Sequence, residues 1–463
     1  MAELIAGVDT STQSVKIVVR DAVTGQLYKE AKASHPEGTE VDPKFWWDAF
    51  LKVVNEIGGL DSVKAISIAG QQHGMVTLDK DGNVIRPALL WNDTRSAAQA
   101  ESLNQKFPNI HKLVGSKLVA AFTASKVLWV NKMEEKNCEK IAAICLPHDY
   151  LSWKLSGSKD IKDIFTDRSD ASGTGYFDPK KNSYDLSIVK EIIGDQRAIV
   201  LPKVMGPIET CAKDANGILI ACGAGDNAAA ALGLGAEIGD VIVSLGTSGT
   251  AFAVSKNPVT DPSGEVAGFC DATGNYLPLV CTLNASRILD AANKVLETDY
   301  AELGKLALSA NPGADGLTLL PYFEGERTPN RPEAKGIFSG ITLHNFTKAN
   351  MARAMIEGML CGLADAIDSL KRNEVPLKRV LLIGGAAKSE AVCKIASAIF
   401  GMKVIVPPSG EYVANGAAKQ AASLLLGKFP DWKLGESKSY EETPTPEVLD
   451  SYRKLRDETE SWN

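Results

Sequence analysis

Hydrophobic positions follow two different periods along most of the chain. Short apolar runs rich in β-branched residues, such as LIAGVD, VKIVVRD and VKAISIAG, predict buried β-strands. Other segments have apolar residues three or four positions apart, which predicts helices at 95–106, 123–135, 147–156, 184–194 and 226–234. Strands and helices alternate without a low-complexity linker, and this alternation predicts an α/β fold.

Local signals predict where several elements begin or turn. Asp42 and Pro43 suit the N-cap and first position of a helix in DPKFWWDAFLKVVNEIG. Asp81-Gly82 predicts the turn of a hairpin in MVTLDKDGNVIRP. Near the C-terminus, TPEVLDSYRKLRDETESW predicts a closing helix that Thr445 or a neighbour caps.

Two segments about half a chain apart share one pattern. Residues 4–20 consist of an apolar strand, the turn TSTQS and a second apolar strand, and residues 240–256 repeat this around GTSGT. A solenoid would need a short fixed period, so two distant copies predict two related domains instead. We place the boundary near 238–245, which gives domains 1–240 and 241–463.

Composition narrows the class of protein. The chain has 463 residues, of which 44% are hydrophobic and 23% charged, as in ordinary globular proteins with sizeable cores. Disorder, collagen and coiled coil are excluded as the main architecture. With 50 Lys plus Arg against 57 Asp plus Glu, the net charge of −7 argues against a nucleic-acid or anionic-membrane surface.

The cysteines and the N-terminus indicate the compartment. None of the eight cysteines forms a C-x-x-C pair, and several lie in apolar runs, so we expect reduced, buried side chains rather than a zinc site. The start MAELIAGVDTS lacks the features of a signal peptide, and no run of about 18 apolar residues predicts a membrane span. The compartment we expect is the cytoplasm.

Turns rich in Gly, Ser and Thr offer backbone N–H groups and hydroxyls to phosphate oxygens. A single turn of this kind commonly only connects two strands, whereas the matched pair TSTQS and GTSGT favours phosphate binding. The chain has neither a Walker A motif nor a dinucleotide-binding G-x-G-x-x-G with its acidic partner.

Two aspartates stand at the ends of predicted strands. Asp9 precedes TSTQS and would repel phosphate unless a cation intervenes, so it is a candidate Mg²⁺ ligand; the alternative is a turn-initiating Asp. Asp226 begins the helix of GDNAAAALGLG. It is either a helix N-cap or a carboxylate that accepts a proton from a substrate hydroxyl.

Two further segments have a composition that suits a polyhydroxylated ligand. In GQQHGM, Gln72 and His73 lie between small residues that let a ligand approach, although His73 could equally be a hydrogen-bonded loop residue. In WNDTRS, Trp91 and Asn92 combine an aromatic platform with an amide. The alternative is a solvated loop before a helix.

In order along nearly the whole chain, the sequence resembles the FGGY family of carbohydrate kinases, and within it the xylulokinases. The resemblance rests on GVDTSTQSVK, SIAGQQHGM, ALLWNDTRS, FTASKVLWV, PHDYLSWKLSG, DASGTGYFD, GAGDNAAAALGLG, VSLGTSGTAFAVS, LPYFEGERTP, KGIFSGITL through MARAMIEG, and LIGGAAKSE. GQQHG and WND resemble the ketopentose branch rather than the glycerol kinase branch.

The resemblance implies an actin-like, hexokinase-like ATPase fold, with two RNase-H-like domains around a catalytic cleft. It implies that Asp226 is the catalytic base, that Asp9 helps to hold Mg²⁺–ATP, and that Gln72, His73, Trp91, Asn92, Asp226 and Asn227 bind the sugar. By the same resemblance, ATP is bound by Ser11, Thr12, Gln13, Lys16, Gly246, Thr247, Ser248, Gly384, Gly385, Ala386, Ser389 and Asn415. The family's first hairpin usually has D-x-G-T-S-G, where this chain has serines at 11 and 14.

The function so implied is phosphorylation of D-xylulose at its terminal (5) hydroxyl by ATP with Mg²⁺. The sugar and ATP are then its partners, with no nucleic acid and no membrane, and a homodimer is one assembly that the sequence allows. Alternatives are another substrate such as L-ribulose, L-xylulose or a sugar acid, a non-catalytic nucleotide-dependent binding protein, and an actin-like filament or chaperone ATPase.

Overall fold

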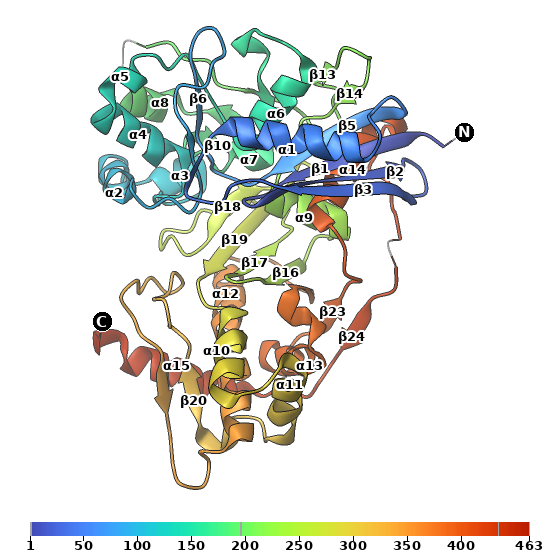
Figure 1. The fold of residues 1–463 in the computed structure, drawn as a ribbon. Helices are drawn as coiled ribbons and strands as arrows, with labels where there is room; N and C mark the ends of the chain where they lie inside the picture. Colours follow the sequence, from blue (N-terminus) through green and yellow to red (C-terminus); the bar gives the residue numbers. More distant parts are fainter. Residues whose placement is uncertain (1, 195–196, 434, 463) are drawn as a thin grey trace. The chain divides into compact units, whose positions relative to one another are not determined.

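The computed structural model describes residues 2–194, 197–433 and 435–462, and the chain folds into two compact units (Figure 1). The first unit holds the chain as far as Ala236, then Lys256–Leu277, and a segment from Gly410 that contains helix α14 (Tyr412–Leu426). The second holds Glu237–Ser255, Pro278–Ser409 and the chain from Gly435 onward.

A single boundary after residue 240 therefore does not describe the two units. The chain returns to the first unit twice, and both returns lie within the predicted domain 241–463. Helix α14 returns because its small side chains fit closely against the first sheet. Ala414, Ala418, Ala421 and Ala422 share a buried cluster with Ile5, Val18 and Ala65.

The first unit is built on a seven-stranded sheet with the order β13-β14-β5-β1-β2-β3, in which β15 also pairs with β5. Strand β2 is antiparallel to both of its neighbours, β1 and β3, whereas β1, β14 and β15 each run parallel to β5. The strands are β1 (Leu4–Thr10), β2 (Ser14–Asp21), β3 (Leu27–Ser34), β5 (Val63–Gly70), β13 (Ala212–Lys213), β14 (Leu219–Ile220) and β15 (Ala224–Gly225).

Within the second seven-stranded sheet, the strands from β19 onward repeat this topology in the order β19-β17-β16-β22-β23-β24. Strands β19, β17 and β16 are antiparallel, and β16, β22 and β23 are parallel, just as β3-β2-β1 continues into β5 and β14. The internal similarity predicted between 4–20 and 240–256 is confirmed. The strands are β16 (Asp240–Leu245), β17 (Gly249–Ala253), β19 (Tyr276–Thr282), β22 (Arg379–Gly384), β23 (Val404–Val406) and β24 (Lys438–Tyr440).

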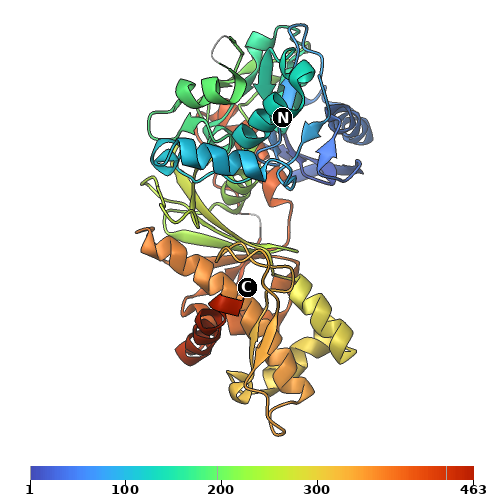
Figure 2. The ribbon, with the colours of Figure 1, turned by 90° about the vertical axis from the view of Figure 1, so that its left-hand side faces the viewer.

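Helices cover both faces of the first sheet because successive side chains of β1 point to opposite sides. Ala6 and Val8 share a cluster with Trp46 and Phe50 of α1 (Pro43–Glu56), whereas Ile5 packs with α14. In the second unit the long helix α12 (Lys348–Arg372), orange in Figure 2, packs against β17 and against α11 (Tyr300–Ser309).

The predicted helices are confirmed as α2 (Ala97–Lys106), α4 (Thr123–Met133), α6 (Pro147–Ser156), α8 (Leu186–Ile193) and α9 (Asp226–Leu234). The Asp42 side chain caps α1 as predicted, accepting from the Lys44 N–H. Thr445 stands at the N-cap position of α15 (Pro446–Glu458) as predicted, but its side chain makes no cap hydrogen bond.

The turn at Asp81-Gly82 forms, with the Gly82 N–H donating to the Asp79 carbonyl at 3.0 Å. The predicted hairpin is short: Leu78 bridges Val84, and the Ile85 N–H donates to the Thr77 carbonyl at 3.0 Å. Its first strand, β6 (Val76–Leu78), also pairs with β8 (Ala143–Cys145).

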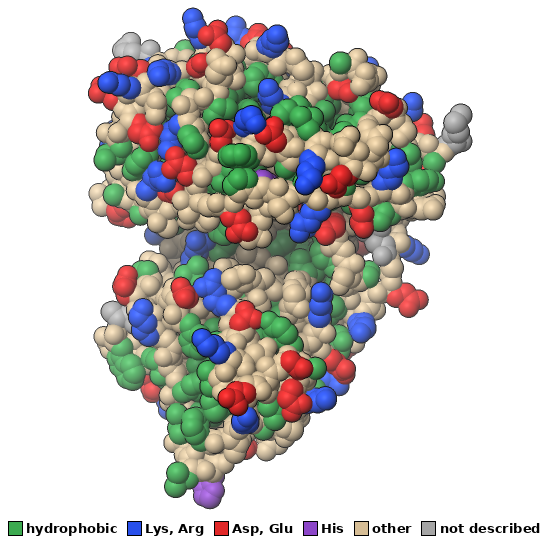
Figure 3. All heavy atoms as spheres, in the orientation of Figure 1, with side chains coloured by type: hydrophobic (Ala, Val, Ile, Leu, Met, Phe, Trp, Pro, Cys, Tyr) green, Lys and Arg blue, Asp and Glu red, His purple; other side chains and the backbone are tan. Residues whose placement is uncertain are grey.

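The remaining elements complete the two units. They are β4 (Glu40–Val41), β7 (Ala88–Leu89), α3 (Ile110–Val114), α5 (Glu135–Cys138), β9 (Phe165–Thr166), α7 (Arg168–Ala171), β10 (Phe177–Asp178), β11 (Ser183–Tyr184), β12 (Lys203–Val204), β18 (Ala267–Cys270), α10 (Arg287–Leu296), β20 (Thr318–Leu320), β21 (Ile337–Ser339) and α13 (Glu390–Phe400). Among the described residues, no helix combines the length and the apolar character that crossing a membrane requires. On the face drawn in Figure 3, acidic and basic side chains are mixed over the surface of each unit.

Candidate active site

Three strand ends of the first unit meet at one edge of its sheet. Residue Ala69 of β5 pairs with Asp9 of β1 on one side and with Ala224 of β15 on the other. Asp226 follows directly after β15, as the first residue of α9. The fold thus brings Asp9 and Asp226 to the carboxyl ends of parallel strands, where α/β sheets commonly bind ligands.

Asp9 has a buried carboxyl group with an oxygen that lacks a partner. The residue is 5% exposed, and its Oδ1 has no hydrogen bond. Lys16 Nζ lies 4.0 Å from the other oxygen and 2.5 Å from Glu411. Burial raises the pKa of Asp9 to about 7 although Lys16 acts to lower it. A bound cation would supply the partner that Oδ1 lacks.

The first hairpin accommodates serine at positions 11 and 14 without strain. Neither Ser11 nor Ser14 has a positive φ, so no left-handed backbone is needed there. The Ser11 N–H and hydroxyl both donate to the Ser14 carbonyl at 3.0 Å. At the tip, the Trp91 indole N–H donates to the Thr12 hydroxyl at 3.0 Å, which joins the predicted phosphate turn to the predicted sugar segment.

Asp226 is the first residue of α9 rather than its N-cap. Gly225 holds the cap position and offers no side chain, so the capping alternative for Asp226 is wrong. One carboxylate oxygen accepts from the Asn227 backbone N–H at 2.7 Å and side-chain amide at 2.9 Å. Burial raises the pKa of Asp226 to about 7, the Asn227 N–H opposes the rise, and Asp9 adds to it. A carboxylate with this pKa suits a general base near neutral pH.

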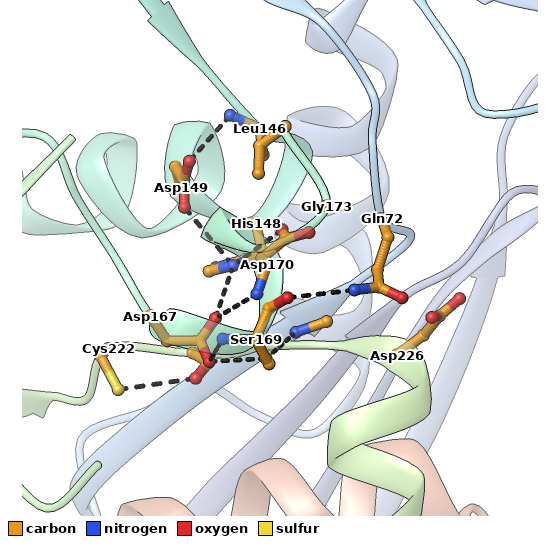
Figure 4. Close-up of polar contacts among 12 residues, drawn as sticks. Gln72, Leu146, His148, Asp149, Asp167, Ser169, Asp170, Gly173, Cys222 and Asp226 are labelled. Carbon is orange, nitrogen blue, oxygen red and sulfur yellow. Dashed lines mark hydrogen bonds and ion pairs between the residues drawn. The ribbon is translucent and has the colours of Figure 1, made fainter. Parts of the chain in front are cut away.

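Gln72 lies beside Asp226 and is held from two sides (Figure 4). Its amide Nε2 donates to the Ser169 carbonyl at 3.2 Å, and its Oε1 accepts from Asn227 at 3.4 Å. A side chain at Gly225 would come within 2.8 Å of Gln72, so the glycine allows this close approach. The structure therefore brings together three of the predicted substrate residues, Gln72, Asp226 and Asn227.

His73 adopts a left-handed backbone, with φ of 68°, and its conformation is supported by a buried lysine. The His73 carbonyl accepts from Thr123 Oγ1 and Lys126 Nζ, both at 3.1 Å. Nδ1 of the ring lies 2.7 Å from the Gly173 carbonyl, and the ring centroid lies 5.0 Å from that of Phe122. The sequence analysis did not identify Lys126 as a functional residue. Its position inside the largely apolar segment FTASKVLWV was the feature that could have indicated a buried lysine.

Of the other predicted sugar-binding residues, Trp91 is exposed and Asn92 is half-buried. Trp91 is 38% exposed, and the Asn92 amide donates to the Gly38 carbonyl at 3.3 Å. The predicted phosphate residue Gln13 uses its carbonyl to accept from the His35 N–H at 3.1 Å, and its side chain is exposed.

In the second unit, the two predicted nucleotide segments are neighbours. Leu245 of β16 pairs with Gly384 of β22, so the turn with Gly246, Thr247 and Ser248 and the segment 384–389 leave the same edge of the sheet. Gly384 has φ of 97°, and a side chain there would meet the Leu245 carbonyl at 2.5 Å, so only glycine fits.

Within segment 384–389, Gly385 begins a short 3₁₀ turn and Ala386 is buried. Ser389 caps α13, its hydroxyl accepting from the Val392 N–H at 3.5 Å. Asn415, which we expected to act with this segment, lies on α14 in the first unit. Its Oδ1 accepts from Arg20 Nε at 2.9 Å, so Asn415 serves at least to tie α14 to β2.

Three comparisons with known proteins agree with this arrangement. Residues 4–233 match the model of the N-terminal domain of the FGGY family of carbohydrate kinases, and residues 241–425 match that of the C-terminal domain. Xylulose kinase from Streptomyces rubiginosus is 41% identical over 444 residues, which cover 92% of this chain and 89% of that protein. Xylulose kinase from Escherichia coli K12 is 34% identical over 435 residues, covering 90% and 89%.

Solved structures show the same similarity. The crystal structure of xylulose kinase from Bifidobacterium adolescentis has a TM-score of 0.93 and 48% identity, covering 98% of this chain and 99% of that one. The structure of Plasmodium falciparum glycerol kinase with ADP, at 20% identity, shares the fold with a TM-score of 0.86.

Proposed function

Because the chain belongs to the FGGY family of carbohydrate kinases and has their two-domain actin-like, hexokinase-like fold, we propose that it transfers the γ-phosphoryl group of ATP to the 5-hydroxyl of D-xylulose. The observation that carries the proposal is the pair of carboxylates, Asp9 and Asp226, at the strand ends of the first unit. The similar proteins named xylulose kinase supply the choice of sugar.

Asp226 accepts the proton of the sugar hydroxyl as that oxygen attacks phosphorus. Asn227 orients the carboxylate through its two hydrogen bonds to one oxygen, which leaves the other oxygen for the substrate. Gln72, held between Ser169 and Asn227, presents its amide next to the base. With His73, Trp91 and Asn92 it binds the sugar hydroxyls and excludes water.

Asp9 fits a role as a ligand of Mg²⁺–ATP. Its Oδ1 is buried and without a partner, and Mg²⁺ prefers carboxylate and water oxygens. When bound, the cation neutralises charge on the phosphates. Around it, the Thr12 hydroxyl, the N–H groups of Thr12 and Gln13 and the ammonium group of Lys16 bind phosphate oxygens. Ser11 joins them when its N–H and hydroxyl exchange the Ser14 carbonyl for phosphate.

The second unit carries its own predicted nucleotide-binding residues. Gly246, Thr247 and Ser248 contact phosphate, and the segment Gly384, Gly385, Ala386 and Ser389 contacts the adenosine, since both leave one sheet edge. The absence of side chains at the two glycines lets a planar base approach the backbone. The Asn415 Oδ1 already accepts from Arg20 Nε. Asn415 binds the nucleotide either with its amide hydrogens or after it gives up this bond.

A sugar panel scored by ADP release tests the proposed function. We expect D-xylulose to give the highest kcat/KM, with L-ribulose, L-xylulose and sugar acids as the comparison substrates. Preference for one of those would leave the assignment as a sugar kinase intact and change the sugar substrate. ATP binding with no sugar-dependent ADP release would favour a non-catalytic binding protein. ATP-dependent sedimentation without sugar turnover would favour a filament.

A further inference from the structure

A buried cluster behind Asp226 contains one imidazole and three carboxylates. His148, Asp149, Asp167 and Asp170 are all at most 4% exposed. His148 Nε2 lies 2.9 Å from Asp170, 3.4 Å from Asp149 and 3.6 Å from Asp167. Burial opposes a charge on the ring, but Asp149 and Asp170 raise the pKa of His148 well above its usual value.

The cluster reaches the candidate active site through Ser169. The Ser169 hydroxyl donates to Asp167 Oδ2 at 2.6 Å, which orients its lone pairs toward the Gly225 N–H that donates to it at 3.0 Å. Gly225 is the residue directly before Asp226. The Ser169 carbonyl accepts from Gln72 at 3.2 Å, so one residue holds both the start of α9 and a predicted sugar ligand (Figure 4).

The imidazolium of His148 lowers the cost of burying the carboxylates around it. Asp167 can therefore stay ionised and buried, and it holds Ser169 in place. Asp167 also accepts from the Ser169 backbone N–H at 2.7 Å, so the serine is held by both its backbone and its side chain. A side chain at Gly223 would come within 2.5 Å of His148 Nδ1, which shows how closely the strand leading to Asp226 packs on the cluster.

We propose that Ser169 is a positioning residue for Asp226 and Gln72, held by the buried cluster of His148, Asp167 and Asp170. This inference rests on the proposed function of Asp226 as the base. Ser169 does not touch the substrate. It acts by fixing the strand-to-helix junction from which the base projects, where a displacement of about 1 Å is enough to cost about a hundredfold in rate.

The test compares Ser169→Ala and Ser169→Cys with Ser152→Ala in the full-length chain. Ser152 lies on the same helix as His148, is fully buried, and its hydroxyl has no partner among the described residues, so it controls for the loss of a buried hydroxyl. Wild-type turnover of D-xylulose, measured first, decides the proposed function. The kcat, the KM values for sugar and ATP, and the thermal midpoint of each variant then test the inference.

We expect Ser169→Ala to lower kcat by at least about tenfold at a temperature where it is folded, because the base is displaced. The KM for ATP should stay within about twofold, since Ser169 does not contact the phosphate turns. Ser169→Cys, with its weak sulfur acceptor, should lie between the wild type and Ser169→Ala, and Ser152→Ala should match the wild type. Wild-type kcat in the folded Ser169 variants, or an equal loss in Ser152→Ala, would overturn the inference.

Discussion

Asp9 and Asp226 lie on either side of the central strand β5, and the charge of Asp9 contributes to the raised pKa of Asp226. The two carboxylates come from segments more than two hundred residues apart in the sequence, and their strands share Ala69 as the neighbour. This pairing places a candidate cation ligand and a candidate base in one electrostatic environment.

Removing the base should reduce the chemical step far more than binding. Asp226→Asn keeps the shape and one acceptor, but it cannot take the proton of the sugar hydroxyl. We expect kcat to fall about 10²–10⁴-fold, with ATP binding retained. Steady-state kinetics and ATP titration measure both. A variant that keeps more than about a tenth of the wild-type kcat would place the base elsewhere.

The pH profile should report the interaction between the two carboxylates. The pKa of Asp226 is raised to about 7, so kcat/KM should rise with pH and level off above neutrality. The charge of Asp9 acts to raise this pKa. Asp9→Asn should therefore shift the rising part of the kcat/KM profile, its acid limb, to lower pH and should also lower the plateau value of kcat/KM. A limb that stays in place or moves to higher pH in this variant contradicts the coupling.

The buried Asp9 carboxylate, when charged, should also lower the free energy of unfolding. Burial raises its folded-state pKa to about 7 from a normal value of 3.8, so the native state binds a proton more tightly than the unfolded state. Stability from this group is complete below the unfolded pKa and is lost as pH rises through about 7. At pH 8 in the absence of Mg²⁺, Asp9→Asn should be more stable than the wild type by up to about 4 kcal/mol. This gain should vanish below the unfolded-state pKa, which urea unfolding at both pH values can check.

Lys126 should control sugar affinity through His73. Its buried ammonium group donates to the carbonyls of His73 and Ala121, and burial lowers its pKa to about 7. Lys126→Met keeps the volume but removes the Lys126 donor from the His73 carbonyl. We therefore expect kcat/KM for the sugar to fall by a factor that corresponds to about 1–3 kcal/mol. Lys132→Met removes an exposed lysine from the same helix and serves as the control. Equal kinetics in the two variants would show that His73 does not depend on Lys126.

Substitution of His73 itself complements the Lys126 experiment. If the ring binds a substrate hydroxyl, His73→Ala should cost about 1–3 kcal/mol with the sugar while the KM for ATP stays the same. The structure gives Nδ1 a partner in the Gly173 carbonyl, which orients the ring. Unchanged sugar kinetics would identify His73 as a packed loop residue.

Local patterns were enough to predict several strands, the duplicated sheet and the helices α1, α2, α4, α6, α8, α9 and α15, because periodicity and turn residues act over a few positions. They did not predict α10 to α14. They also located Asp9 and Asp226 at strand ends. They could not show that Asp167, Ser169 and Gly225 form one hydrogen-bonded path, since the contact between Ser169 and Gly225 spans more than fifty residues. They also could not show that α14 returns to the first unit, because its alanine face is specific only against β1 and β5.

The close packing of α9 against α14 allows a last test of how the base is positioned. A side chain at Gly416 would lie 1.9 Å from the Ala229 carbonyl of α9, closer than any real contact. Gly416→Ala must push α9 away, and Asp226 is the first residue of that helix. We expect a loss of stability of about 1–3 kcal/mol, as for other overpacked cores, together with a lower kcat.

Gly362→Ala is the matched control, since this glycine also lies within a long helix but has no neighbouring atom closer than 3.6 Å. An alanine there should be neutral or stabilise the helix by up to about 1 kcal/mol. Urea unfolding and kcat, measured on both variants, separate the two effects. If Gly416→Ala unfolds like the wild type and keeps its kcat, α9 does not depend on this close approach and the base is positioned from the Ser169 side alone.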